Sequence, residues 1–371
     1  MITENAIFHT FVVMETVAWI GFSQAVFTGF LIAAKKGHNV SDKVLASWLF
    51  LIAIEFCTYA IDLMRFKNGV ILSNPFFLFN PTLYLYTCSL TNKKFSLRWI
   101  QLLHLLPYIF FEGLAYWFGE KLSFGNFFKT NSTLWFRIAF LGATFISWFV
   151  YSILSIIKVH RHRMNLKNEF STLDSYKRIS WLLFILVVYI LYWLGILTLG
   201  ILNYFKITDE IILNFNYSVL LGLLYILGFY GLKQELIFSE KPYDESDGNG
   251  KYKYSRLQEK YKKEVQKKIS TYFEKEKPYL DSELTIGTLA SRLNIPRHVI
   301  TEVLNTTFNR NFYQYVNEYR VEAVKHMLSD PKKNFLSIEA IGYECGFNSK
   351  STFFSVFKNI TGKTPTQFKE L

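Results

Sequence analysis

Polar side chains suited to contacting base edges and phosphates recur in two helical patterns near the C-terminus. In "NIPRHVITEVLN" and in "NSKSTFFSVFKNITGK", apolar residues fall at helical spacing and leave cationic and short polar residues on the opposite face. Arg, Lys, His, Ser, Thr and Asn are the side chains that hydrogen-bond bases and the phosphate backbone. The candidate contacts to double-stranded DNA are Arg297, His298, Thr301, Asn305, Lys350, Ser351, Thr352, Ser355, Lys358 and Lys363.

Each pattern predicts a pair of short helices joined by a turn. In the first pair, Thr285 is the candidate N-cap and the chain turns at Asn294. In the second, Ser337 is the candidate N-cap, Gly346 permits the turn, and an inward face takes Phe353, Val356, Phe357 and Ile360. A lone helix pair is usually part of an ordinary bundle. Two pairs joined by the amphipathic stretch "FYQYVNEYRVEAVKHMLSD" instead match successive major grooves about 34 Å apart.

The first part of the chain has a different character. Hydrophobic residues make up 51% of the 371 residues and aromatic residues 18%, and they concentrate before Lys233. An apolar helix needs about 20 residues to cross a bilayer. The third of seven candidate spans contains Pro75 and Pro81 and is expected to kink or break. The seven predicted spans are residues 6–34, 44–63, 71–90, 102–118, 134–157, 181–204 and 211–232.

Basic residues orient these spans, because cytoplasmic loops carry an excess of Lys and Arg. The loops after the first, third and fifth spans hold 12 Lys and Arg residues, against 6 on the opposite side. We therefore expect the N-terminus outside and the tail inside a bacterial cytoplasmic membrane. The lipid bilayer is the implied partner of this half.

Carboxylates inside apolar spans are costly, by about 2.5–3.5 kcal/mol at a helix centre on insertion scales. Glu15, Glu55, Asp62 and Glu112 lie within or near the outer ends of such spans, and Arg137 is a candidate counter-charge. Two interpretations stay open. Glu15, Glu55, Glu112 and Arg137 line an outward pocket for a small-molecule or membrane signal, or the acids only hydrogen-bond neighbouring helices.

A composition change marks the domain boundary. The polar stretch "SEKPYDESDGNGKYKYS" predicts a flexible linker, and the helix predicted next, Tyr254 to Lys277, has apolar residues at every fourth position. That helix either pairs in a coiled-coil homodimer or packs on the domain that follows. The predicted divisions are residues 1–233 for the membrane part, 234–280 for the linker and helix, and 281–371 for the DNA-binding part.

From about Leu284 to Lys369 the sequence resembles the DNA-binding domain of AraC/XylS-type transcription regulators. The resemblance rests on the "GF" turn at Gly346, the S-x-F-x-x-x-FK pattern from Ser351 and the "GKTP" ending. The sequence departs from the family pattern at Cys345, where a small residue is usual, and at Glu302, which puts an acid on the first helix thought to contact DNA. "NPTLYLYTCSL" followed by "LLHLLPYIFF" also resembles the multi-span part of membrane-bound members.

The resemblance implies an all-α protein in which a seven-helix bundle precedes a tandem helix-turn-helix domain. It implies a membrane-embedded one-component regulator that couples an external signal to sequence-specific DNA binding. The alternatives are a transporter or membrane enzyme with a regulatory tail, and a tethered regulator with no ligand. The three cysteines have no short spacing, and no catalytic triad or metal cluster is evident. We expect no enzymatic activity, no cofactor and no metal.

Overall fold

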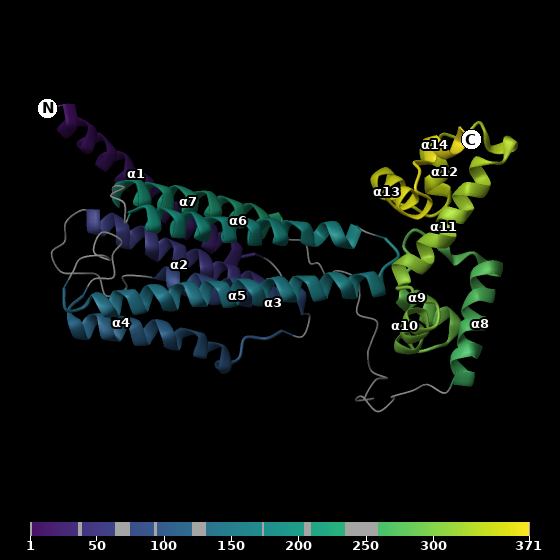
Figure 1. Ribbon diagram of the computed structural model, residues 1–371, viewed down its shortest axis with the longest axis horizontal. Helices are drawn as coiled ribbons and strands as arrows, with labels where there is room; N and C mark the ends of the chain where they lie inside the picture. Colours follow the sequence, from purple (N-terminus) through teal and green to yellow (C-terminus); the bar gives the residue numbers. More distant parts are fainter. Residues whose placement is uncertain are drawn as a thin grey trace. The chain divides into compact units, whose positions relative to one another are not determined.

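The computed structural model describes residues 2–35, 39–63, 75–92, 95–120, 131–172, 174–203, 209–233 and 259–370. Every regular element in these ranges is a helix, which confirms the predicted all-α class (Figure 1). The chain divides into two compact units. One, here called the bundle, comprises residues 1–160 and 180–238, and the other, the C-terminal unit, comprises residues 161–179 and 239–371. The predicted linker, residues 239–255, lies outside the described residues.

Helices of the bundle are built from long apolar segments. Within it, α2 packs against α1, α3 and α7, and α1 also packs against α7. Two 3-10 turns, Pro75–Leu78 and Trp99–Leu105, lead into α3 and α4. The helices are α1 (Ile2–Ala33), α2 (Val40–Leu63), α3 (Phe79–Thr91), α4 (Leu106–Phe118), α5 (Leu134–Glu169), α6 (Asp174–Asn203) and α7 (Asp209–Lys233).

Five helices among the described residues are long and apolar enough to cross a membrane. They are Met14–Ala33, Val40–Ile61, Leu134–Glu169, Ser180–Ile201 and Asn214–Lys233. The third and fourth predicted spans instead give α3 and α4, with 13 residues each. At about 1.5 Å per residue, each α-helix covers about 20 Å, less than the roughly 30 Å hydrocarbon core. Prolines explain the shortening, because Pro75 begins one 3-10 turn and α4 has a proline in its first turn. The count of seven stays a prediction.

The C-terminal unit contains two helix-turn-helix pairs that share one helix. Its first pair is α9 and α10, its second is α12 and α13, and α11 joins them (Figure 1). The helices are α8 (Glu259–Glu276), α9 (Ile286–Leu293), α10 (Arg297–Thr306), α11 (Phe312–Leu328), α12 (Ile338–Glu344), α13 (Lys350–Thr361) and α14 (Pro365–Lys369). The tandem arrangement predicted from the sequence is confirmed.

Each pair is organised around its own apolar core, and α11 contributes to both. Tyr315 and Val316, in the first half of α11, pack with the apolar residues of α9 and α10. Val324 and Leu328, in its second half, pack with those of α12 and α13. One helix therefore belongs to both pairs, so the pairs are held at a set separation.

The amphipathic helix before the first pair is part of the same core. Val265, Ile269 and Phe273 of α8 are buried among α9, α10 and α11. The Phe273 ring lies 5.0 Å from the ring of Tyr315 and 5.1 Å from that of Tyr319, measured between centroids. Of the two alternatives for this helix, packing on the following domain is therefore the one observed. A coiled coil through these residues is not available while they are buried there.

Candidate nucleic-acid interface

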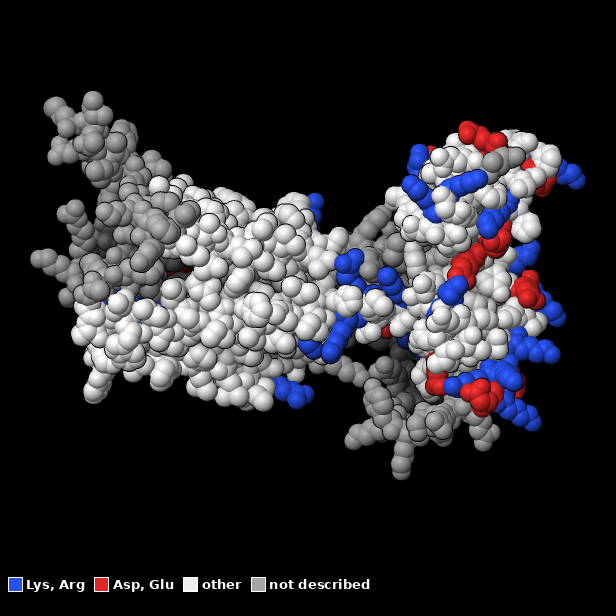
Figure 2. Space-filling view, in the orientation of Figure 1, with Lys and Arg blue, Asp and Glu red and all other residues white. Residues whose placement is uncertain are grey.

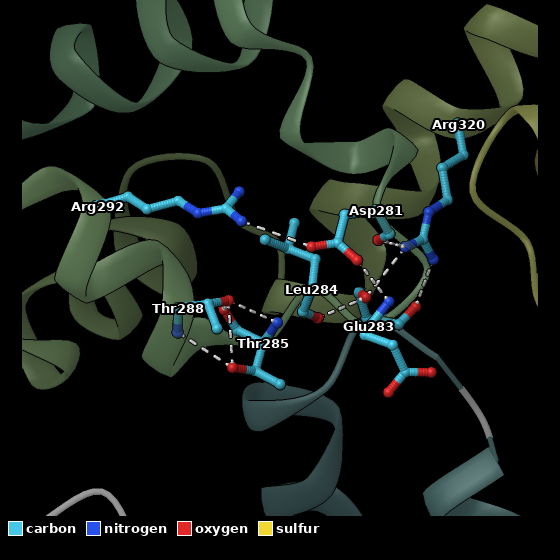
Figure 3. A network of polar contacts seen from close by, with 8 residues as sticks. Asp281, Glu283, Leu284, Thr285, Thr288, Arg292 and Arg320 are labelled. Carbon is cyan, nitrogen blue, oxygen red and sulfur yellow. Dashed lines mark hydrogen bonds and ion pairs between the residues drawn. The ribbon is translucent and has the colours of Figure 1, made fainter.

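Local capping residues determine where the first helix of the first pair begins and ends. Thr285 begins α9 with a reciprocal capping box, in which its hydroxyl accepts from the Thr288 N–H and the Thr288 hydroxyl accepts from the Thr285 N–H (Figure 3). Asn294 ends α9 in the left-handed conformation, with φ 51°. The predicted cap and turn are confirmed. The outward face of α10 is therefore presented from a rigid turn.

On α10, the candidate contacts differ in how open they are. His298 and Asn305 are exposed, whereas Thr301 is half-buried and donates its hydroxyl to the Arg297 carbonyl at 2.9 Å. Arg297 is exposed as well, but its guanidinium lies against α9, since a Cβ atom at Gly287 would come within 2.1 Å of its Nη2. Glu302 on the same helix forms a 3.2 Å ion pair with Lys262 of α8. The first pair thus offers a face whose charge is partly neutralised.

The second pair offers a more open cationic face. Lys350, Ser351, Ser355 and Lys358 on α13 are exposed, and Lys363 is exposed just beyond its end. Ser349 caps the helix, with its hydroxyl accepting from the Thr352 N–H and donating to the Thr352 hydroxyl at 2.9 Å. Lys350, Ser351 and Ser355 lie in the first two turns of α13, the helix that approaches base edges in helix-turn-helix docking.

Two predicted orientations on α13 are corrected. Thr352 is only 6% exposed, because the helix begins at Ser349 and its third residue turns inward to complete the cap. It therefore holds the helix start rather than facing DNA. Ile360, expected in the core, is 42% exposed near the end of the helix. Neither shift changes the positions of the exposed lysines.

Surface charges modulate this face. The Lys350 ammonium contacts the carboxylate of Glu339 on α12 and lies 5.8 Å from the centroid of the Phe354 ring. The side chains of Lys350 and Glu339 are 58% and 44% exposed, so the pair contributes little in water. A phosphate or base acceptor can therefore replace Glu339 at small cost.

A glycine turn seats the second pair against the start of the domain. Gly346 has φ +88°, and a Cβ atom there would lie 2.3 Å from the Tyr279 carbonyl oxygen. Both the backbone conformation and the contact exclude a side chain. The predicted turn at Gly346 is confirmed, and it packs directly on the backbone of residues 279 and 280.

One buried cation was missed by the sequence analysis. Arg320 on α11 is 1% exposed and donates to the Tyr279 carbonyl oxygen at 2.8 Å. It also donates to the Asp281 carbonyl oxygen at 2.9 Å (Figure 3). Burial lowers the pKa of Arg320 to about 10, so its guanidinium remains charged at neutral pH. The sequence pattern could have predicted this burial, because Arg320 lies four residues from both Val316 and Val324 and so falls on the apolar face of α11.

The intramembrane candidates are placed as follows. Glu55 is 5% exposed and its Oε1 accepts from the Tyr217 hydroxyl at 3.1 Å. Glu15 on α1 and Glu112 on α4 are half-buried. The side chain of Asp62 lies outside the described residues.

Arg137 is buried and donates to Glu120, at 3.0 Å, and to Asn131, at 2.8 Å. Glu120 was not among the predicted acids, because it follows α4 rather than lying in an apolar span. A hydrogen bond from Thr133, together with Asn131 and Arg137, lowers the pKa of Glu120. Arg137 therefore belongs to a polar cluster at the start of α5.

The C-terminal helix pairs are the part of the chain that matches known proteins. Residues 289–370 match a family described as "Helix-turn-helix domain". The Msm operon regulatory protein of Streptococcus mutans is 29% identical over 89 residues, which are 24% of this chain and 31% of that protein. The Melibiose operon regulatory protein of Escherichia coli is 29% identical over 91 residues, 24% of this chain and 29% of that one.

A third relative, the "Uncharacterized HTH-type transcriptional regulator in cgkA 5'region" of Pseudoalteromonas carrageenovora, is 32% identical over 24% of this chain and 50% of its own. The chain thus spans half or less of the length of these relatives. A solved structure of a Listeria innocua protein of unknown function covers 29% of this chain and 94% of its own, with 22% identity and a TM-score of 0.25. The paired helices, the family match and the named operon regulators together show an AraC-type helix-turn-helix domain at the C-terminus.

Proposed function

We propose that this chain is a membrane-embedded transcription regulator that binds double-stranded DNA in a sequence-specific manner. The observation that carries the proposal is the pair of exposed helices α10 and α13, held at a set separation by their shared helix α11. Such spacing suits two major-groove segments on one face of a duplex, about one helical turn apart. The regulatory names of the relatives over this segment support the same conclusion.

Roles follow from position on the two helices. We assign base contacts to Lys350, Ser351 and Ser355, because they lie in the first turns of α13 and are exposed. Lys358 and Lys363 lie at or beyond its end and suit phosphates, as attraction independent of sequence. On α10, His298 and Asn305 are the open candidates, while Arg297 and Thr301 are engaged with their own pair.

The DNA-binding part of the proposal is tested with the full chain in lipid nanodiscs. The protein selects fragments from a random DNA pool, and the bound fragments are footprinted. We expect protection of two segments about 10 bp apart on one face, with affinity falling steeply as salt rises. A chain ending at residue 233 is the control and should select nothing. Protection of one segment alone would contradict tandem binding.

Membrane embedding is supported by the surface of the bundle. Large apolar side chains such as Phe30, Ile146 and Leu191 are exposed there, which a water-soluble surface of this extent would not favour. Figure 2 shows few Lys, Arg, Asp or Glu residues on the visible face of the bundle. We propose that the bundle lies in the bacterial cytoplasmic membrane, with the C-terminal unit in the cytoplasm. Five spans or seven give this same sidedness, since both numbers are odd.

The number of spans is decided by labelling. Seven spans put the loop between α3 and α4 in the cytoplasm, whereas five spans put it on the same side as the loop after α2. Lys94→Cys, in a chain whose native cysteines are replaced by alanine, should react with an impermeant thiol reagent from outside whole cells only in the five-span case. Lys43→Cys, at an exposed position near the start of α2, is the cytoplasmic control, which should react only after the cells are permeabilised.

The second half of the proposal is that the bundle receives a signal that alters DNA binding by the C-terminal unit. The buried pair of Glu55 and Tyr217 joins α2 to α7, the last apolar helix before the C-terminal unit. Glu55→Gln and Glu112→Gln should alter the transcriptional response while leaving insertion and DNA selection unchanged. Replacement of the bundle by an unrelated membrane anchor should abolish the response. An unchanged response after that replacement would show that the bundle is only a tether.

A further inference from the structure

The turn between α5 and α6 belongs to the C-terminal unit. Residues 161–179 form part of that compact unit, although they are far in sequence from residues 239–371. Phe170 forms an isolated antiparallel bridge with Thr285, the N-cap of α9. Ser171 is buried, and both its N–H and its hydroxyl donate to the Leu284 carbonyl, at 3.3 and 2.6 Å. The turn thus pairs with the strand-like residues that begin the first helix pair.

The same turn supplies acceptors to the buried arginine. Arg320 Nη1 donates to the Ser171 carbonyl at 2.9 Å, and Nη2 donates to the Ser171 hydroxyl at 3.1 Å. Asn317 also donates to the Ser171 carbonyl, at 3.2 Å. A guanidinium has five N–H donors, and a buried one that loses partners is costly. Without the turn, Arg320 would keep its bonds to Tyr279, Asp281 and Asn317 and lose both bonds to Ser171.

We propose that Leu284, Thr285, Asn317 and Arg320, here called the waist site, are the receptor through which the bundle acts on the DNA-binding helices. Its ligand is the chain's own turn, Phe170 and Ser171. The helix α8 is a poor transmitting element, because its apolar face is buried in the domain core. The turn, in contrast, is continuous with α5 and α6, two helices long and apolar enough to cross a membrane.

Position explains why docking at this site would matter. Thr285 caps α9 of the first pair, and Arg320 lies on α11, which both pairs share. The Tyr279 carbonyl bonds to Arg320 and also forms the surface against which Gly346 of the second pair is seated. The hydrogen-bond partners of Ser171 lie on α11 and before α9, so docking leaves the outward faces of α10 and α13 for DNA. A docked turn therefore fixes the two pairs without competing for the duplex.

The coupling has a definite direction. Undocking removes two acceptors from Arg320 and loosens the joint between the pairs, so the two helices are no longer preorganised for one duplex. Affinity for DNA with both segments should fall, while affinity for DNA with a single segment should not. A signal can drive this change only by favouring one of the two states. This part rests on the proposed function, whereas the docking itself does not.

Docking is tested first, by a disulfide in the full chain in nanodiscs. Cα atoms of antiparallel bridge partners lie about 4.5–5.5 Å apart, within the range that a disulfide spans. Phe170→Cys combined with Thr285→Cys should therefore cross-link on mild oxidation. The two single variants, which retain Cys57, Cys88 and Cys345, measure the background. Failure of the double variant to cross-link above that background would overturn docking, whether or not the protein binds DNA.

Coupling is tested second, with Ser171→Tyr, whose ring does not fit a buried site. The matched variant is Glu169→Tyr, at the exposed last residue of α5, two residues before Ser171. We expect Ser171→Tyr to weaken binding to the selected two-segment DNA by about fivefold or more, within the usual range of coupling factors. Glu169→Tyr should bind as the parent does. Ser171→Ala, which keeps the carbonyl and removes only the hydroxyl, should give a smaller loss and guards against misfolding of the tyrosine variant.

The outcomes separate the two proposals. Cross-linking with a selective loss in Ser171→Tyr supports the waist site. Cross-linking with parent-like DNA binding in both serine variants would overturn coupling through it. If the parent selects no DNA at all, the proposed function fails, and the disulfide still decides whether the turn docks.

Discussion

The two helix-turn-helix pairs follow one plan but are embedded differently. The first is braced by α8, whose Val265, Ile269 and Phe273 complete its core, and its Glu302 is paired with Lys262. The second is flanked by the short α14, where the ring centroids of Phe368 and Phe357 lie 5.5 Å apart. Its exposed face carries the lysines. We therefore propose that the first pair mainly supports the domain and that the second mainly contacts base edges.

The largest expected effects test the support that α8 gives. Phe273→Ala and Phe357→Ala each remove a fully buried ring, at an expected cost of about 3–5 kcal/mol in unfolding free energy. Hydrogen exchange of the full chain should show lost protection in α9 and α10 for the first variant and in α12 and α13 for the second. Tyr261→Ala, an exposed residue of α8, is the control. Unchanged protection in Phe273→Ala would mean that α8 is not part of the first pair's fold.

A difference in base discrimination is the next largest effect. Lys350→Ala should weaken the selected site by about 1–3 kcal/mol and reduce discrimination between bases. Arg297→Ala, on the corresponding part of α10, should cost less in binding, because its guanidinium lies against α9. Binding of selected and scrambled DNA is measured for each variant. If Arg297→Ala has the greater effect on discrimination, the roles assigned to the two pairs are reversed.

Salt dependence separates attachment from base contact. Lys363→Ala should weaken selected and scrambled DNA by the same factor, because we assign it to a phosphate beyond α13. The slope of the logarithm of affinity against the logarithm of salt should become shallower by about 0.9, the value for one phosphate contact. Loss confined to the selected sequence would instead place Lys363 among the base contacts.

The smallest expected effect concerns the acid on the first pair. Glu302→Gln removes a negative charge from α10 and leaves Lys262 its 3.9 Å ion pair with Glu259, so affinity for any duplex should rise. The Lys262 and Glu302 side chains are half-buried, at 15% and 31% exposed. Surface ion pairs are worth about 0.2–1 kcal/mol, so we expect a gain of that order, which salt should diminish. Glu322→Gln, which breaks the 2.7 Å contact with Lys325 on α11, is the matched control. Equal gains in both variants would show only a change in net charge.

Local chemistry determined what could be predicted from the sequence. Thr285, Asn294, Ser337 and Gly346 were placed correctly, because caps and turns depend on a few neighbouring residues. Thr352 was misassigned because it lies beside the buried Phe353 at the helix start and bonds to the capping Ser349, a contact that apolar periodicity does not predict. A break in the third span was expected from Pro75 and Pro81, but the 3-10 turn before α4 was not, since hydropathy does not report where an apolar segment changes its helix type.

Long-range contacts account for the part that was missed. The bonds from Arg320 to Ser171 join residues 149 apart in sequence. Nothing in the local pattern around Ser171 distinguishes it from an ordinary loop serine, and its partner became evident only in the folded unit. Glu120 was overlooked for a similar reason, because its role depends on Arg137 being brought beside it. Such pairs depend on tertiary structure rather than on propensity or period.

The close packing of Gly346 on the Tyr279 backbone constrains the spacing between the two DNA segments that this protein would recognise. The contact at Gly346 leaves no room for a side chain, and both pairs share α11. The distance between α10 and α13 is therefore fixed, and the two helices cannot bind DNA independently of each other. Inserting one base pair between the two segments rotates the second by about 36° and moves it by about 3.4 Å. Five inserted base pairs would turn it to the opposite face of the duplex. Promoters controlled by this chain should therefore vary more in base sequence between the segments than in the length of that spacer.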